Sequence, residues 1–365
     1  MVAIYKAPHS YTGEDSVEIS CHGSSYIINR IIELLLQHGC RMARPGEFTQ
    51  RAYLNGKMDL SQAEAVADLI ASTNRTTHDI AISQLRGHYS TDLSRLRDQL
   101  LKLTSLLELE LDFSDHEDLE FADRTELLKL ALQINGHICR LADSFETGQA
   151  LKQGIPVAIV GKTNVGKSTL LNRLLHEDRA IVSDIHGTTR DTIEDTIVLD
   201  GITFRFIDTA GIRHTSDTVE QMGIERSIAA ARRARIIIML TEPGVSYPDI
   251  PLSEGQTVIR IVNKTEVFQA KYGIGIDNLR QQLITAAPPF SDTDVIVTNA
   301  RHYDALRRAS QSLSRVLEGL RSHLSGDIIS EDLRDVLSIL SEITGGQITS
   351  SEILETVFKN FCIGK

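Results

Sequence analysis

The chain has 365 residues, a length that allows about two or three domains. Hydrophobic residues make up 41% and charged residues 24%, and no apolar run approaches the roughly 18 residues that span a bilayer, so we expect no membrane partner. The net charge of -11, from 49 acidic and 38 basic residues, argues against a broad electrostatic grip on nucleic acid. Any nucleic-acid contact would have to be local or shared with a partner.

Cysteine usage indicates the cellular compartment. Cys21, Cys40, Cys139 and Cys362 lie far apart and form no Cys-x-x-Cys pair, which fits reduced thiols better than a disulfide framework or a zinc site. The sequence also shows no signal peptide. We therefore expect a cytoplasmic protein.

The first 56 residues have the pattern of a small α+β domain. Val17, Ile19 and Cys21 alternate as in a strand, and residues 24–38 are spaced as a helix that Gly39 would cap. Helical periodicity follows over residues 57–150. Its apolar stripe consists of Leu93, Leu96, Leu100, Leu103 and Leu107.

Residues 151–290 have a different pattern. β-Branched runs alternate there with helical stretches, which predicts a parallel sheet with crossover helices. The runs are residues 155–160, 202–207, 235–240 and 257–262. Helical periodicity returns over residues 291–365, so we predict a multidomain α+β and α/β protein in which an α/β domain is inserted into an all-helical domain.

The strongest motif is Gly161–Ser168, Gly-Lys-Thr-Asn-Val-Gly-Lys-Ser, which follows a predicted strand and opens a predicted helix. It matches the phosphate-binding loop GxxxxGK[ST] in its required context. Backbone N–H groups would surround the phosphates, Lys167 would add positive charge, and Ser168 would bind Mg²⁺. The expected nucleotide contacts in this segment are Asn164, Val165, Gly166, Lys167, Ser168 and Thr169.

Two further segments would sense the terminal phosphate of a bound nucleotide. A DxxG motif ends the second predicted strand, with an acid for the Mg²⁺ shell and a glycine N–H for the γ phosphate; it consists of Asp208, Thr209, Ala210 and Gly211. The polar loop Gly187–Asp191 offers Thr189 as a Mg²⁺ ligand that binds only in the GTP state. This order of motifs predicts a Ras-like P-loop GTPase domain, or G domain.

Base recognition is predicted after the strand at 257–262. Asn263, Lys264 and, three residues after Asn263, Glu266 resemble the guanine-binding motif NKxD, with glutamate in place of aspartate. Ala270 and Lys271 resemble the SAK-like loop whose backbone contacts the guanine oxygen.

The spacing in this region is too short for a parallel sheet. The few residues between Asn263 and a strand at 267–269 cannot form a crossover, which normally takes a dozen or more residues. The link at 244–256 also lacks helical periodicity. We hypothesise that residues are missing from both links, in which case Glu266 is not the guanine acid.

The group that orients the attacking water is left open by these motifs. In many small GTPases a glutamine follows DxxG, but Ile212 stands there in this chain. Asp217 and Glu220 are the candidates, although the sequence alone favours reading each as a solvated acid before a helix.

Motifs outside the G domain make a family resemblance specific. They are Tyr11–Asp15, Arg44–Thr49, Leu54–Lys57, Gln62–Val66 and the ending Phe361–Lys365. Together with the G-domain motifs they resemble the MnmE (TrmE) family of tRNA-modification GTPases along nearly the whole chain. The final Cys-Ile-Gly-Lys is the most diagnostic of them.

The resemblance implies a homodimer that works with the flavoprotein MnmG. The pair would add a carboxymethylaminomethyl-type group to C5 of the wobble uridine of certain tRNAs, using a one-carbon tetrahydrofolate. It also implies potassium-stimulated hydrolysis by G domains that dimerise across the nucleotides. The implied K⁺ ligands are Asn164, Ser183, Ile185 and Thr188, and the implied catalytic residues are Glu220, which would orient water, with Lys167 and Thr189.

Several alternatives stay open. The family has a longer region before Tyr11, so residues 1–56 are expected to be a partial folate-binding domain. Cys362 can belong to the modification centre or be an ordinary half-buried thiol. The chain could also act in ribosome assembly, although no GXXG-bearing RNA-binding module is found, or as a switch or scaffold whose helices respond to GTP.

Overall fold

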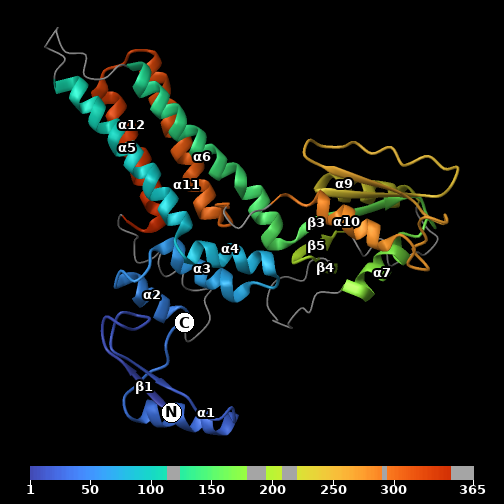
Figure 1. The fold of residues 1–365 in the computed structure, drawn as a ribbon, viewed down its shortest axis with the longest axis horizontal. Coiled ribbons are helices and arrows are strands. Elements are labelled where there is room, and N and C mark those ends of the chain that lie inside the picture. The colour runs from blue at the N-terminus through green and yellow to red at the C-terminus, as the bar shows by residue number, and fades with distance from the viewer. Residues whose placement is uncertain (113–123, 179–194, 208–219, 290–293, 347–365) are drawn as a thin grey trace. The chain divides into compact units, whose positions relative to one another are not determined.

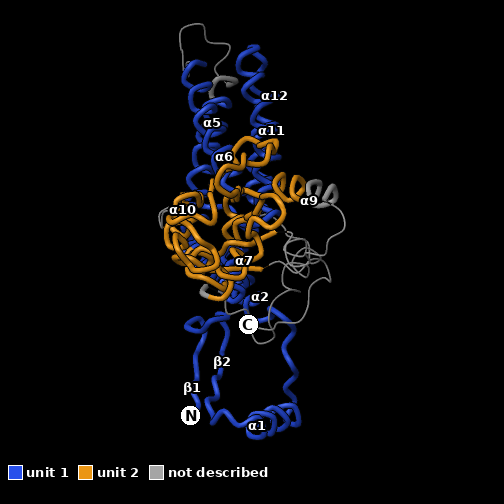
Figure 2. The backbone as a smooth tube through the Cα atoms, turned by 90° about the vertical axis from the view of Figure 1, so that its right-hand side faces the viewer, with its two compact units in different colours: residues 1–71, 80–145, 295–365 blue, residues 72–79, 146–294 orange. Residues whose placement is uncertain are grey.

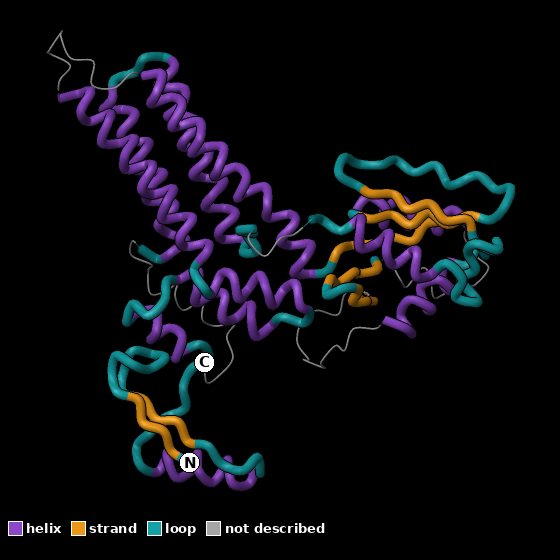
Figure 3. Tube along the Cα trace, viewed as in Figure 1, coloured by secondary structure: helices purple, strands orange, loops and turns teal. Residues whose placement is uncertain are grey.

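The computed structural model describes residues 1–112, 124–178, 195–207, 220–289 and 294–346 (Figure 1). The chain divides into two compact units (Figure 2). We call residues 1–71, 80–145 and 295–365 the helical unit, and residues 72–79 and 146–294 the sheet unit. Long helices dominate the first and the larger sheet lies in the second (Figure 3). The mixed architecture is confirmed, whereas the domain boundaries remain a prediction.

The helical unit begins with a small α+β element. Strands β1 (Val2–Tyr5) and β2 (Ser16–Ile19) pair antiparallel. Helix α1 (Ser25–Gln37) follows Ser24 and stops before Gly39, whose φ is +92°, as the sequence predicts. None of the residues of α1 is buried, so this element has no core of its own among the described residues.

The rest of the helical unit is a helix bundle with three shorter helices at its start. Its members are α2 (Glu47–Leu54), α3 (Leu60–Ala71), α4 (Arg75–Leu85, shared between the units), α5 (His88–Asp112), α6 (Arg124–Gln153, likewise shared), α11 (Ala300–Arg321) and α12 (Gly326–Thr344). Side chains of α5, α6, α11 and α12 form one apolar core. All five leucines of the predicted stripe on α5 are buried in it, which confirms that helical face.

The sheet unit contains a five-stranded sheet in the order β4-β5-β3-β6-β7. Its strands are β3 (Ile155–Gly161), β4 (Asp195–Leu199), β5 (Ile202–Phe206), β6 (Ile236–Thr241) and β7 (Thr257–Val262), and its helices are α7 (Lys167–Asp178), α9 (Glu220–Arg233) and α10 (Ile276–Ala286). The four predicted strands are confirmed.

The four predicted strands pair parallel as expected, and the sheet has one further edge strand, β4, that was not predicted. β4 pairs antiparallel with β5 through a two-residue turn, Asp200 and Gly201, whose φ angles are 49° and 79°. Two left-handed residues in a row make the hairpin turn that Asp-Gly favours. The Asp-Gly dipeptide at 200–201 is therefore the feature of the sequence that predicts a hairpin, and with it strand β4.

No helix within the described ranges is both long enough and apolar enough to cross a membrane.

Candidate nucleotide site

The loop between β3 and α7 has the shape of a phosphate cradle. Gly166 has a φ of +101°, and a Cβ atom there would collide with Nδ2 of Asn263. A Cβ atom at Gly161 would collide with the carbonyl oxygen of Leu240. Asn164 is also left-handed, at φ 62°. The glycines therefore let the backbone pass close to its neighbours at the N-terminus of α7, where backbone N–H groups and the helix dipole favour an anion.

Lys167 holds its ammonium group over this loop. Its Nζ donates to the carbonyl oxygens of Gly161 at 2.7 Å and Lys162 at 2.8 Å. Burial lowers the pKa of Lys167, because the ammonium is partly desolvated and no acid in the described part of the chain offsets the loss of water. A phosphate placed beside it would supply negative charge, so the residues present fit a nucleotide phosphate. Ser168, half-buried in the same first turn of α7, fits the hydroxyl ligand expected for Mg²⁺.

Asn263 connects the phosphate cradle to the base-side loop. Its side chain is buried; Nδ2 donates to the carbonyl oxygen of Val165 at 2.8 Å, and Oδ1 accepts from the backbone N–H of Ala270 at 3.0 Å. The structure thus brings together three predicted motifs. Sequence reasoning expected Asn263 to hold the base, and the structure shows that both ends of its amide bind backbone.

The charged residues of the base-side loop are exposed. Lys264, at φ 61°, places Nζ 2.5 Å from Oε1 of Glu242, which directly follows β6. Glu242 was not predicted, because nothing in the sequence marks an acid one residue after a strand as a lysine partner. Lys271 lies 5.5 Å from the ring centre of Tyr272. Glu266 is exposed, three residues after Asn263.

The segment after Asn263 forms a closed turn instead of a further strand. The backbone N–H of Thr265 donates to the carbonyl oxygen of Phe268 at 3.1 Å, and the backbone N–H of Phe268 donates to Oγ1 of Thr265 at 3.0 Å. Gln269 makes only an isolated bridge with Ile274. This agrees with the spacing argument that no crossover fits between Asn263 and residues 267–269.

The other predicted site residues lie outside the described residues. They are Ser183, Ile185, Thr188, Thr189, Asp208, Thr209, Ala210, Gly211 and Cys362. Glu220 is the first residue of α9, but its side chain is not described. In the described ranges no three His, Cys, Asp or Glu side chains gather in a way that could hold a metal ion. The structure therefore assembles the phosphate and base-side loops and leaves the switch residues untested.

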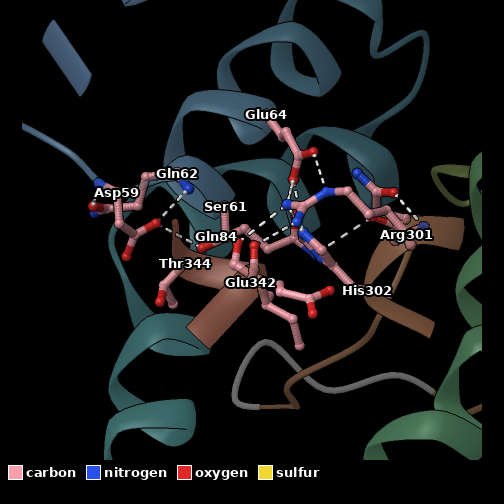
Figure 4. Close-up of polar contacts among 12 residues, drawn as sticks. Asp59, Ser61, Gln62, Glu64, Gln84, Arg301, His302, Glu342 and Thr344 are labelled. Atoms are coloured by element: carbon pink, nitrogen blue, oxygen red, sulfur yellow. Dashed lines mark hydrogen bonds and ion pairs between the residues drawn. The ribbon is translucent and has the colours of Figure 1, made fainter. Parts of the chain in front are cut away.

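A second polar cluster escaped the sequence analysis. Glu64 on α3 meets Arg301 and His302 at the start of α11 (Figure 4). Glu64 lies in the motif Gln62–Val66, and Arg301 follows Asn299, whose side chain accepts from the N–H of Arg301 at 2.9 Å. These residues are more than 230 positions apart in the chain, so no local pattern could have joined them.

Comparisons with known proteins agree on one family. A profile described as MnmE helical domain matches residues 60–362, and one described as GTP-binding protein TrmE N-terminus matches residues 1–57. A protein named tRNA modification GTPase MnmE from Phocaeicola vulgatus is 54% identical over 100% of this chain and 80% of its own length. Proteins of the same name from Bacteroides fragilis and Parabacteroides distasonis are 51% and 53% identical, over 100% of this chain and 86% of theirs.

The alignments are longer than the chain. The first spans 398 positions against 365 residues, so at least 33 aligned positions have no counterpart in this chain. This supports the hypothesis of missing residues.

Proposed function

The chain belongs to the MnmE (TrmE) family, and from this premise we propose that it hydrolyses GTP and couples hydrolysis to tRNA modification. The observation that carries the proposal is the buried amide of Asn263, which ties the phosphate cradle at Val165 to the base-side loop at Ala270. A phosphate cradle alone would suit many nucleotides. Its attachment to a base-side loop supports a site that reads the phosphates and the base together.

The proposed modification is at C5 of the wobble uridine, U34. There the chain, as a cytoplasmic homodimer acting with the flavoprotein MnmG, would help add a carboxymethylaminomethyl-type group with a one-carbon tetrahydrofolate. Support comes from family membership and from the relatives' names, which include tRNA modification. The match of residues 1–57 to the family's N-terminus supports a folate-binding part in that region. Cys362 would belong to the modification centre.

Hydrolysis would use the residues around the cradle. Lys167 binds the β and γ phosphates, Ser168 and Thr189 hold Mg²⁺, and Asn164 with Ser183, Ile185 and Thr188 holds K⁺. When bound, the two cations supply positive charge beside the phosphates. Asp208–Gly211 senses the γ phosphate, and Glu220 orients the attacking water through a second water. The position of Asn164 within the loop between β3 and α7, where it has a left-handed backbone, supports this assignment.

Base choice would fall to the loop that follows β7. Asn263 fixes the position of this loop through Ala270, and Lys264 and Lys271 contribute the flanking side chains. Glu242 restrains Lys264 by its ion pair.

The deciding experiment compares steady-state GTP hydrolysis in KCl and NaCl at equal ionic strength. We expect potassium to raise kcat by about an order of magnitude or more. Glu220→Ala should abolish hydrolysis and tRNA modification while GTP still binds, and Glu225→Ala, on the same helix, should change neither. A rate that ignores the cation, together with an active Glu220→Ala variant, would refute the mechanism.

A further inference from the structure

The C-terminal end of α12 is held by side chains from elsewhere in the helical unit. The last carbonyl groups of a helix have no partner within the helix. Here the backbone N–H groups of Gly345 and Gly346 both donate to the carbonyl oxygen of Ser341, so this carbonyl group has partners. Arg301 donates to the next two, from Nη1 to the carbonyl oxygen of Glu342 at 2.6 Å and from Nη2 to that of Ile343 at 3.1 Å.

Arg301 is itself fixed in place by a largely buried acid, whose side chain is 13% exposed. Its Nε and Nη2 donate to the two carboxylate oxygens of Glu64 at 3.0 and 2.9 Å, a fork-shaped pair that sets the plane of the guanidinium group (Figure 4). Nε2 of His302, which is 2% exposed, lies 2.7 Å from Oε2 of the same carboxylate. Glu64 therefore fixes the orientation of the guanidinium plane. In this orientation Nη1 and Nη2 face the carbonyl oxygens at the end of α12.

Tyr53 fixes Gly345, the residue that directly follows α12. Its hydroxyl donates to the carbonyl oxygen of Gly345 at 3.0 Å. Gly345 has a φ of +78°, and a Cβ atom there would collide with the Tyr53 hydroxyl, so only glycine allows this contact. Two residues from distant parts of the chain thus determine where the backbone leaves α12.

The other end of the same helix is built differently. The side chain of Ser325, which precedes α12, makes no capping hydrogen bond. A helix of 19 residues in a shared apolar core does not need two external side chains at one end to stay folded. Two side chains from distant parts of the chain, both partly buried, donate to the backbone at this exit, which points to a role for the exit itself.

We propose that Arg301, oriented by Glu64 and His302, is a positioning residue which, together with Tyr53, sets the direction in which the chain leaves α12 toward Cys362. Residues 347–365, which include Cys362, lie outside the described residues, so the proposal concerns their starting point at Gly345 and Gly346. It rests on the proposed function, in which Cys362 belongs to the modification centre. Arg301 would act on the tRNA reaction through this geometry and would not touch the nucleotide.

The chain offers a matched pair of arginines for the test. Arg308 lies on the same helix and pairs with the same α12 residue, but through the exposed Glu342 carboxylate at 2.6 Å. Arg301→Lys keeps a positive charge beside Glu64 but cannot reach two carboxylate oxygens and two carbonyls at once. Arg308→Lys is the control: it is the same substitution, but Arg308 binds the side chain of Glu342, so no hydrogen bond to the α12 backbone is lost.

The first readout is activity, with the flavoprotein partner present. We expect Arg301→Lys to lower kcat for tRNA modification at least about tenfold, since small misplacements of a reacting group have effects of this size. KM for tRNA and GTP hydrolysis should stay within about twofold of the parent, as should every parameter of Arg308→Lys. Equal modification rates in the two variants would overturn the proposal.

The second readout measures position directly and does not depend on catalysis. Cys21, Cys40 and Cys139 are replaced by serine, and spin labels are placed at Cys362 and at Gln99→Cys on the exposed side of α5. Electron-spin distance measurements should give a broader distribution in Arg301→Lys and in Tyr53→Phe, a variant that removes one hydroxyl, than in Arg308→Lys. Identical distributions would refute the positioning role. If Cys362→Ser retains full modification activity, Cys362 does not belong to the modification centre. The distance distributions still test whether Arg301 and Tyr53 position the chain that leaves α12.

Discussion

Gly166 and Gly244 are both left-handed, with φ of +101° and +78°, but their surroundings differ. A Cβ atom at Gly166 would collide with the amide of Asn263, whereas one at Gly244 would meet nothing within 4 Å. The cost of backbone strain and the cost of a steric collision can therefore be measured separately at these two positions.

We expect Gly244→Ala to lower the free energy of unfolding by about 1–2 kcal/mol, the cost of a left-handed alanine. Gly166→Ala should cost more and also weaken GTP binding, because Asn263 must shift away from Val165 and Ala270. Urea unfolding and equilibrium GTP binding of both variants measure the two effects. Equal losses of stability together with unchanged GTP affinity would show that the Gly166–Asn263 contact does not shape the site.

Asn263 shows what a motif can and cannot predict. The motif correctly placed Asn263 directly after a strand, because its spacing from a strand end is a local property of the sequence. Its partners are the backbone of Val165 and Ala270, and the first of these is 98 positions away. Contacts of this kind depend on the packed sheet and are not encoded in the spacing of the motif.

Between elements, the buried carboxylate of Glu64 joins α3 to α11. Burial alone would raise its pKa, but hydrogen bonds and charge from His302 and Arg301 outweigh burial and hold the pKa below the ordinary 4.5. A carboxyl whose pKa is lower in the folded chain stabilises it above the unfolded pKa. That stabilisation is lost as the pH falls through the folded pKa.

Glu64→Gln should therefore destabilise the chain most at neutral pH, by roughly 3 kcal/mol, because it leaves Arg301 without its buried partner. The difference from the parent should begin to shrink as the pH falls below about 4.5, where Glu64 is protonated in the unfolded chain, and should be smallest below the lower pKa of the folded chain. Urea unfolding at several pH values measures this. Glu33→Gln, which breaks the exposed pair with Arg30, is the control and should change stability little at any pH. A pH-independent loss for Glu64→Gln would contradict the sign of the shift.

Asn74 connects the start of α4 to the hairpin of β4 and β5. Its Oδ1 accepts from the N–H of Thr77 at 2.8 Å, as in a helix N-cap, and its Nδ2 donates to Thr203 Oγ1 on β5 at 2.7 Å. The N–H of Thr76 also donates to the carbonyl oxygen of Gly201 at 3.3 Å. In the chain, β5 ends at Phe206, two residues before the first residue of the predicted DxxG motif at Asp208–Gly211.

Two substitutions separate the roles of Asn74. Asn74→Asp keeps the capping acceptor but loses the donor to Thr203, and Asn74→Ala loses both. We expect Asn74→Ala to cost about 1–2 kcal/mol and Asn74→Asp less than half of that, since the helix cap should stabilise the fold more than the hydrogen bond to Thr203 does. Thermal unfolding of the two variants beside the parent measures these losses. If Asn74→Asp is as unstable as Asn74→Ala, the Thr203 contact is the dominant one.

Across the whole molecule, sequence reasoning succeeded where a pattern is local and strong. Buried parallel strands are continuous β-branched runs, so β3, β5, β6 and β7 were predicted, and the family resemblance is confirmed by both profile matches. The antiparallel edge strand β4 was missed because its hairpin turn was not considered. The Glu64 cluster was missed because its members meet only in three dimensions.

Each compact unit has its own apolar core, formed by the helices in one and by the sheet in the other. The phosphate cradle and Asn263 lie wholly in the sheet unit. A bound nucleotide should therefore stabilise that unit, by about 2.7 kcal/mol at a concentration one hundred times its Kd. Calorimetry with and without GDP should show a shifted transition for the sheet unit and an unshifted one for the helical unit.

Lys167→Ala should remove the shift, because the cradle then loses the charge that binds the β phosphate. A common shift of all transitions would mean that the two cores unfold as one cooperative block, in which case Glu64→Gln should lower the temperature of that common transition, including the unfolding of the sheet unit, to which Glu64 does not belong.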